Sequence, residues 1–104
     1  MPANRLEALQ NMVAANPADR FSRYGLAMEY RNQGRPEEAL AEFHRLMATH
    51  PDYTPAYFHA GQTLEQMGRG EEARSIYRRG IEAATRAGDD HTRSELQAAL
   101  DLLG

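Results

Sequence analysis

The residues of this chain best suited to chemistry are its four histidines, because imidazole nitrogens bind metal ions. No two of His44, His50, His59 and His91 have the i, i+4 spacing of a helical metal site, and none has the flanking carboxylates typical of zinc sites. The 104 residues contain no cysteine, which excludes thiolate ligands and a cysteine nucleophile. We therefore expect no metal centre, and we interpret the histidines as solvated surface side chains.

A short run of arginines is the other candidate for chemistry. Glu71 and Glu82 are spaced to pair with Arg74 and Arg78, so a solvated ion-pair stripe that includes Arg79 is a better interpretation than a phosphate site. The formal net charge of −3 argues against sequence-independent binding of nucleic acid. No nucleophile elbow, phosphate-binding glycine loop or paired metal motif is present. We expect neither an enzyme nor a bound cofactor.

The elements that position these residues are indicated by a repeat. GRPEEA begins at Gly34, and the nearly identical GRGEEA begins at Gly68. Large apolar residues recur at the same interval of 34 residues, in the two series Leu9, Phe43, Tyr77 and Val13, Met47, Ile81. A period of this length is typical of stacked helical units, none of which can bury its apolar face alone.

Each unit is predicted to be a pair of helices. Leu40, Phe43 and Met47 are spaced along one face of a helix. Gly34 suits the left-handed position that follows a helix, and Pro36 suits the first turn of the next one. The GRPEEA phrase is therefore interpreted as a turn between two helices, and we expect an all-α fold.

On these positions the chain resembles the tetratricopeptide repeat (TPR) family, in which each repeat pairs two antiparallel helices, A and B. The family's apolar, small, apolar signature of helix A falls on Leu26, Ala27 and Tyr30, and in the next repeat on Ala60, Gly61 and Leu64. The family's aromatic at the fourth position is present as Tyr57 but is replaced by Arg23 in the first repeat. The resemblance implies an α-solenoid, a TPR-like superhelix of about six helices.

The resemblance also divides the chain, which we expect to be a single domain over 1–104. We predict an N-terminal helix over 3–15 (a degenerate helix B), repeats at 20–53 and 54–87, and a C-terminal capping helix over 89–103. Thr85 stands where a closing proline is usual, so the preceding helix is expected to continue to about Ala87. Thr92 and Glu95 have the spacing of a capping box for the last helix, whose apolar face would be Leu96, Ala99, Leu100 and Leu103.

The A helices of TPR proteins line a concave groove where partners bind. The resemblance implies a groove lined by Phe21, Tyr24, Met28, Arg31, Asn32, Phe58, Gln62, Glu65 and Gln66. Two interpretations of Tyr24 and Phe58 remain open, since these rings could face a partner or pack against neighbouring helices. The chain has no lysine, and Tyr24 and Met28 stand at the positions of the clamp that holds chaperone tails in some family members. We therefore expect no binding of such acidic tails.

Two functions fit these observations. The first is a non-catalytic adaptor or scaffold that binds an apolar-anchored peptide or helix of a partner protein in the groove. The alternative is a self-assembling structural protein that forms homo-oligomers through the groove or the last helix. The sequence shows no secretion signal and no apolar run long enough to span a bilayer, so we expect a cytoplasmic protein without a membrane partner.

Overall fold

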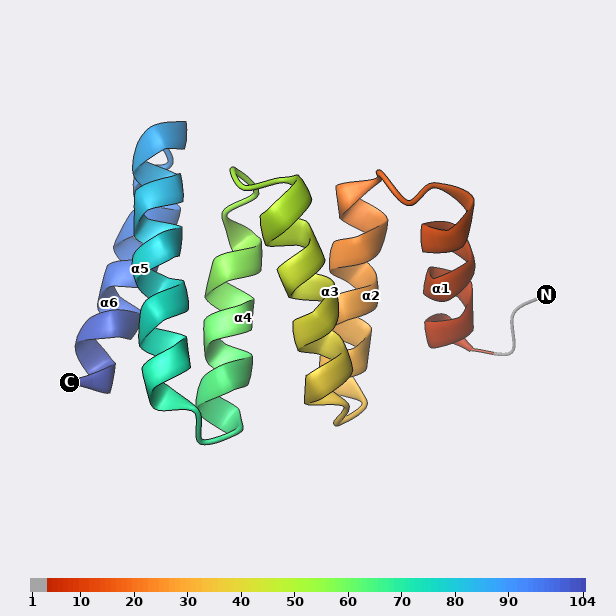
Figure 1. Ribbon diagram of the computed structural model, residues 1–104, viewed down its shortest axis with the longest axis horizontal. Coiled ribbons are helices and arrows are strands. Elements are labelled where there is room, and N and C mark those ends of the chain that lie inside the picture. The colour runs from red at the N-terminus through yellow and green to blue at the C-terminus, as the bar shows by residue number, and fades with distance from the viewer. Residues whose placement is uncertain (1–3) are drawn as a thin grey trace.

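The computed structural model describes residues 4–104, which form six α-helices and no strand (Figure 1). The helices are α1 (Arg5–Ala15), α2 (Arg20–Asn32), α3 (Pro36–Thr49), α4 (Pro55–Gln66), α5 (Gly70–Ala87) and α6 (Asp90–Leu103). Each helix packs against the next along the chain, and α4 also contacts α6. The fold is elongated, at 45 × 29 × 19 Å. The prediction of an all-α solenoid of about six helices is confirmed.

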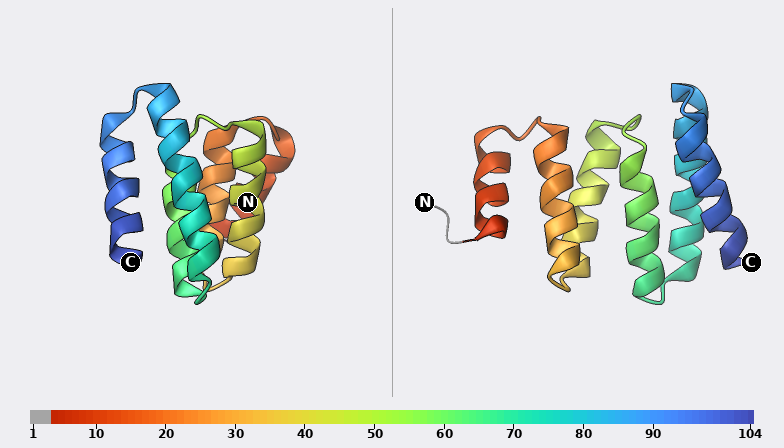
Figure 2. Two further views of the ribbon diagram at one scale, coloured as in Figure 1. Left: turned by 60° about the vertical axis from the view of Figure 1, so that its left-hand side comes forward. Right: turned by 180° about the vertical axis from the view of Figure 1, so that it is seen from behind.

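The helices lie in two layers. Seen from behind, α2 and α6 lie on the near side, with α3 and α5 behind them (Figure 2). Side chains from α2 reach α4, and α4 contacts α6, so these three helices share one surface. We call this surface the α2–α4–α6 face.

The helices can be placed along the segments predicted from the sequence. The α2–α3 pair lies within 20–53 and the α4–α5 pair within 54–87. Helix α5 runs to Ala87, because no proline interrupts it and Gly88 then ends it with a positive φ of 69°. Helix α1 begins at Arg5, and the start predicted at residue 3 lies outside the described residues.

The two GR turns have the conformation that the repeat predicts. Gly34 and Gly68 have φ values of 72° and 75°, in the left-handed region where a side chain would be strained. Pro36 occupies the first turn of α3, where its missing N–H costs no hydrogen bond. These turns bring the two helices of each pair side by side.

The start of α6 differs from the prediction. Its N-cap is Asp89, whose Oδ1 accepts from the Thr92 amide at 3.1 Å, so the expected capping box starting at Thr92 is wrong. The other carboxylate oxygen of Asp89 accepts from Thr54 Oγ1 at 2.9 Å, which ties the start of α6 to the start of α4. These hydrogen bonds lower the pKa of Asp89. The carboxylate therefore also helps to hold α6 beside α4.

Large side chains fill the core between the layers. The largest fully buried side chains, each less than 2% exposed, are Tyr77, Phe43, Leu46, Leu64, Leu96 and Thr63. They come from α3, α4, α5 and α6, so each of these helices contributes to one continuous core. Because no repeat buries its apolar face alone, this shared core is what holds the stack together.

Gly61 of α4 lies directly against the Tyr77 ring of α5. A Cβ atom at this position would lie 2.1 Å from Cε1 of Tyr77, which is far inside van der Waals contact. The Tyr77 ring is fully buried beneath α4, so an added methyl at Gly61 would have to displace it from its place in the core. The small residue of the helix A signature is therefore required here by the ring on α5.

We expect Gly61→Ala to lower the free energy of unfolding by about 1–3 kcal/mol, because the added methyl overpacks the contact with Tyr77. Urea denaturation followed by circular dichroism measures the change. Gly70→Ala is the matched control, since its Cβ would meet nothing within 4 Å and it lies in the first turn of α5. Equal stability of Gly61→Ala and the wild type would contradict this packing.

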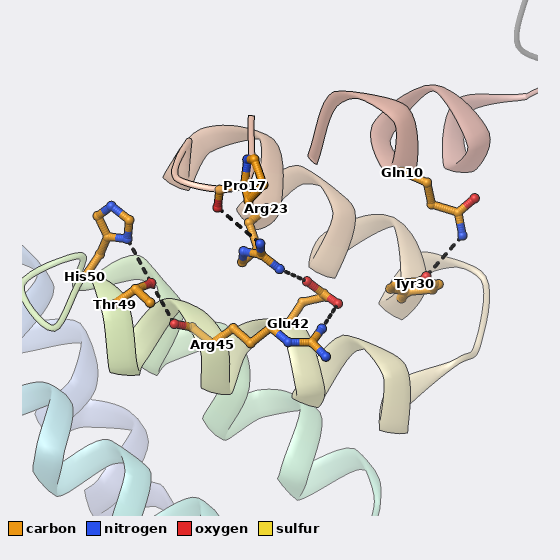
Figure 3. A network of polar contacts seen from close by, with 8 residues as sticks. All are labelled: Gln10, Pro17, Arg23, Tyr30, Glu42, Arg45, Thr49 and His50. Atoms are coloured by element: carbon orange, nitrogen blue, oxygen red, sulfur yellow. Dashed lines mark hydrogen bonds and ion pairs between the residues drawn. The ribbon is translucent and has the colours of Figure 1, made fainter. Parts of the chain in front are cut away.

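Arg23, the departure from the family's aromatic, belongs to a buried ion pair. Its Nη1 lies 2.6 Å from Oε1 of Glu42 on α3, and its Nη2 donates to the Pro17 carbonyl at 3.1 Å (Figure 3). In the next repeat Tyr57 donates to the carbonyl of Pro51 at 2.7 Å. Pro17 and Pro51 stand at equivalent positions of the repeat. Arg23 therefore donates a hydrogen bond to the same backbone carbonyl position as Tyr57 does in the second repeat.

Candidate functional site

A row of aromatic rings runs across the α2–α4–α6 face. Phe21 contacts Tyr53 edge-on with ring centroids 6.0 Å apart, and Tyr53 contacts Tyr24 at 5.4 Å. Tyr24 then contacts the His59 ring at 5.7 Å, and His59 contacts Phe58 at 5.4 Å. We call these five side chains the aromatic row. Edge-to-face contacts of this kind favour a defined orientation of each ring.

The structure distinguishes the roles of the two recurring aromatics. Tyr24 is half-buried, and its ring also lies 6.4 Å from that of Phe43 in the core. Phe58 is half-buried as well, but it lines a pocket between α4 and α6. Both rings pack against neighbours, and Phe58 in addition presents a surface to that pocket. Phe21 is the most open member of the row, at 62% exposed.

A polar cluster around Arg31 borders the aromatic row. The guanidinium reaches from α2 to α4, where Nη1 lies 3.3 Å from Oε1 of Gln62 and Nε lies 3.4 Å from Oε1 of Gln66. Nη1 also lies 3.2 Å from Nδ1 of His59. A guanidinium can only donate, so Nδ1 must accept and the imidazole proton sits on Nε2.

Burial lowers the pKa of His59, and the positive charge of Arg31 lowers it further. The ring is therefore neutral at neutral pH and can keep its contact with the guanidinium. This finding corrects the expectation that all four histidines are solvated. His44 and His91 are exposed, whereas His50 and His59 are half-buried, and His59 lies on the face that carries the aromatic row.

The main pocket of the face lies between α4 and α6. It has a volume of about 400 Å³ and is lined by Phe58, Gln62, Glu65, Tyr77, Glu95, Ala98, Ala99 and Leu102. We call it the α4–α6 pocket. Its volume lies in the range of small-ligand sites, and its lining is mainly apolar with a few polar groups. A smaller hollow of about 190 Å³ adjoins it and is lined by Arg31, Gln62, Glu65 and Gln66.

The base of the α4–α6 pocket is held by Tyr77. The Tyr77 hydroxyl donates to Oε2 of Glu65, which fixes this carboxylate at the boundary of the two hollows. Burial raises the pKa of Tyr77, and the hydrogen bond to Glu65 raises it further. The hydroxyl thus stays protonated and remains a donor. Gly61 makes this position of the Tyr77 ring possible, because a side chain at residue 61 would clash with the ring.

The nine residues predicted to line the groove do not all come together. Phe58, Gln62 and Glu65 line the α4–α6 pocket, and Arg31 and Gln66 line the adjoining hollow with two of them. Tyr24 and Phe21 belong to the aromatic row. Met28 is half-buried and packs against the core, and Asn32 is exposed and lines neither hollow.

Of the wall that α6 contributes to the pocket, only Ala99 was named from the sequence as part of the predicted apolar face. Glu95, Ala98, Ala99 and Leu102 line the pocket, although only the apolar face of α6 was expected to matter. Leu96 is fully buried, while Leu102 is 89% exposed. One feature of the sequence could have predicted this wall. The N-caps Asp19, Thr54 and Asp89 follow one another at intervals of 35 residues, which places α6 as a third helix of the A type.

The arginine stripe on α5 is only partly formed. Arg74 lies 3.5 Å from Glu71 and also donates to the Gly104 carbonyl, but Glu82 makes no ion pair with Arg78 among residues 4–104. In the same part of the chain, no three histidine, aspartate or glutamate side chains come together as a potential metal site. None of the helices described is both long enough and apolar enough to cross a bilayer.

Comparisons with known proteins agree with this geometry. A tetratricopeptide repeat domain protein from Salinibacter ruber has a crystal structure that aligns with a TM-score of 0.76 and 39% identity, covering 82% of this chain and 94% of that one. The solution structure of BPP2914 from Bordetella parapertussis aligns with a TM-score of 0.82 and 28% identity, covering 96% and 87%. The uncharacterized protein MJ0572 of Methanocaldococcus jannaschii is 36% identical over 58 residues, covering 56% of this chain and 67% of that protein.

The sequence pattern of the family described as "Tetratricopeptide repeat" matches residues 30–100, which is more than half of the chain. The match includes both helices of the second predicted repeat and most of α6. The helix pairs, the glycine turns and the small residue at Gly61 are the physical features that such a pattern describes. The chain belongs to the tetratricopeptide repeat family.

Proposed function

We propose that this chain is a non-catalytic adaptor or scaffold that binds an apolar-anchored peptide or helix of a partner protein. TPR domains generally mediate interactions between proteins, and we assign that role here to the α2–α4–α6 face. The two helix pairs, at 20–53 and 54–87, supply the face together with α6. A cytoplasmic location belongs to the same proposal.

The observation that carries the proposal is the α4–α6 pocket at the end of the aromatic row. Phe58 belongs to both, so a partner segment lying along the row would place apolar side-chain surface against the apolar walls of the pocket. Interfaces gain most of their affinity from a few aromatic or apolar anchors in preformed pockets. Because the rings are already held by edge-to-face contacts, little side-chain freedom is left to lose on binding.

The proposal is tested by removing the pocket walls. We expect Phe58→Ala/Leu102→Ala to weaken binding of a partner captured from the native lysate about tenfold or more, because both apolar walls of the anchor site are lost. Affinity is measured by titration calorimetry with the purified partner. Met12→Ala is the control, since it removes a 51% exposed apolar side chain from α1. Equal affinity of the double variant and the control would contradict the proposal.

Self-assembly is the second candidate, and the exposure of Leu102 favours it. A leucine that is 89% exposed beside an apolar pocket is a surface that a second copy can cover. Sedimentation equilibrium over a concentration series separates the two functions. A dimer that is lost in Leu102→Ala supports self-assembly, whereas a monomer at all concentrations removes it.

A further inference from the structure

The α4–α6 pocket combines apolar walls with two carboxylates. Phe58, Ala98, Ala99 and Leu102 supply the walls, while Glu65 from α4 and Glu95 from α6 stand on its two sides. No basic residue of the described chain lines this pocket. The complementary occupant is a side chain with a long apolar stem and a positive head, because such side chains bury their methylenes and keep the charge at a polar rim.

The charges of these two carboxylates are not neutralised within the described chain. Glu65 accepts from the uncharged Tyr77 hydroxyl, and Glu95 lies 3.3 Å from His91, whose ring is charged only when protonated. No arginine of residues 4–104 forms an ion pair with either of them. Arg31, the basic residue of the adjoining hollow, contacts His59 and the two glutamines of α4 instead.

Other occupants fit this chemistry less well. An acidic side chain would be repelled by both carboxylates. A purely apolar side chain would remove water from them and return no hydrogen bond, which costs free energy. A guanidinium or ammonium group lies favourably between two carboxylates, and its stem gains contact with the face of Phe58.

We propose that the α4–α6 pocket receives a lysine or arginine side chain of the partner, so that the partner segment is apolar and basic. This inference rests on the proposed function and names the chemistry of its anchor. The cation would sit between Glu65 and Glu95, and its aliphatic stem would lie between Phe58 and Leu102. The pocket therefore selects partners by charge as well as by apolar contact.

Blocked amino acids test the pocket without a known partner. The ¹⁵N-labelled chain is titrated with Nα-acetyl-arginine methylamide, with Nα-acetyl-norleucine methylamide and with Nα-acetyl-glutamate methylamide. We expect saturable amide shifts at Glu65, Glu95 and Ala98 with the arginine probe, about fivefold weaker binding of the norleucine probe and no shift with the glutamate probe. Salt at about 0.5 M weakens the arginine titration.

Charge variants complete the test. We expect Glu65→Gln/Glu95→Gln to weaken the arginine titration about fivefold, whereas Glu71→Gln/Glu82→Gln removes two exposed carboxylates of α5 that do not line the pocket and leaves it unchanged. Equal binding of the norleucine and arginine probes, or no pocket shift with arginine, overturns the proposal. Pocket shifts that depend on protein concentration without a probe would assign the pocket to a second copy and also overturn it. Binding of the norleucine probe alone would leave the apolar-anchor function standing, while the wall variants decide that function separately.

Discussion

Glu42→Ala is expected to lower the free energy of unfolding by about 3–5 kcal/mol, because it leaves the guanidinium of Arg23 buried without its carboxylate. The two side chains are 9% and 14% exposed, and their atoms lie 2.6 Å apart. A domain of this size has a total stability of roughly 5–15 kcal/mol, so the loss is a large part of it. Urea denaturation measures the change. The control is Glu38→Ala, which breaks the exposed pair with Arg35 and should cost about 1 kcal/mol or less.

The other half of the same prediction is that Arg23→Ala costs less than Glu42→Ala. Without Arg23, the carboxylate of Glu42 keeps its second partner, since Nη1 of Arg45 lies 2.5 Å from Oε2. The Arg45 side chain is 59% exposed, so it can move to keep its contact with Glu42 at little cost in free energy. Equal destabilisation of Arg23→Ala and Glu42→Ala would contradict the view that Glu42 is the central partner of both arginines.

The second repeat indicates how the pair can be replaced. Tyr57 and Ile76 occupy the positions of the second repeat that are equivalent to Arg23 and Glu42, and both are buried. We expect Arg23→Tyr/Glu42→Ile to recover the stability lost in Glu42→Ala, because an apolar pair of similar volume avoids the desolvation of two charges. A double variant as unstable as Glu42→Ala would show that the first repeat depends on this ion pair for another reason.

Leu96→Ala is expected to cost about 2–5 kcal/mol, because Leu96 is the fully buried anchor of α6 and its loss leaves a cavity. The methyl carbons of Leu96 lie against the site of Gly80, where a Cβ atom would be 2.9 Å from Cδ1. Within the described residues α6 packs mainly against α5 and makes a smaller contact with α4, so it can open before the rest.

Amide hydrogen exchange shows which helices lose stability in Leu96→Ala. We expect the amides of α6 to exchange roughly thirtyfold faster or more in Leu96→Ala, and the α4–α6 pocket to lose binding at the same time. Leu102→Ala is the matched control on the same helix for hydrogen exchange alone, because its side chain is 89% exposed but lines the pocket. Unchanged exchange in α6 would contradict the assignment of Leu96 as its anchor.

Much of the fold could be predicted from the sequence, because the residues that recur in the repeat have strict backbone or packing requirements. Gly34 and Gly68 need a positive φ, and the repeated large apolar residues fill the core. The role of Arg23 was missed, although the sequence contained a signal. Glu42 aligns with the apolar Ile76, so the two departures from the repeat compensate each other across the helix pair.

The candidate site was predicted less completely, because it depends on how α6 lies against α4. The apolar pattern of α6 is out of phase with the repeat, which hid its place beside the A helices. The hydrogen bond from Thr54 to Asp89 that fixes this place joins residues far apart in the sequence, and no local pattern reveals it. The burial of His59 was missed for a similar reason, since it results from contacts with α2.

The central claim, that the α2–α4–α6 face binds the partner protein, is tested most directly by mapping the contact on the ¹⁵N-labelled chain. Amide shifts are followed while the purified partner is added. The account predicts that the largest shifts fall on Phe58, Gln62, Glu65, Ala98 and Leu102, around the α4–α6 pocket. Shifts concentrated instead around His44, Ser75 and Ile76, which line a separate hollow between α3 and α5, would place the partner elsewhere and contradict the claim.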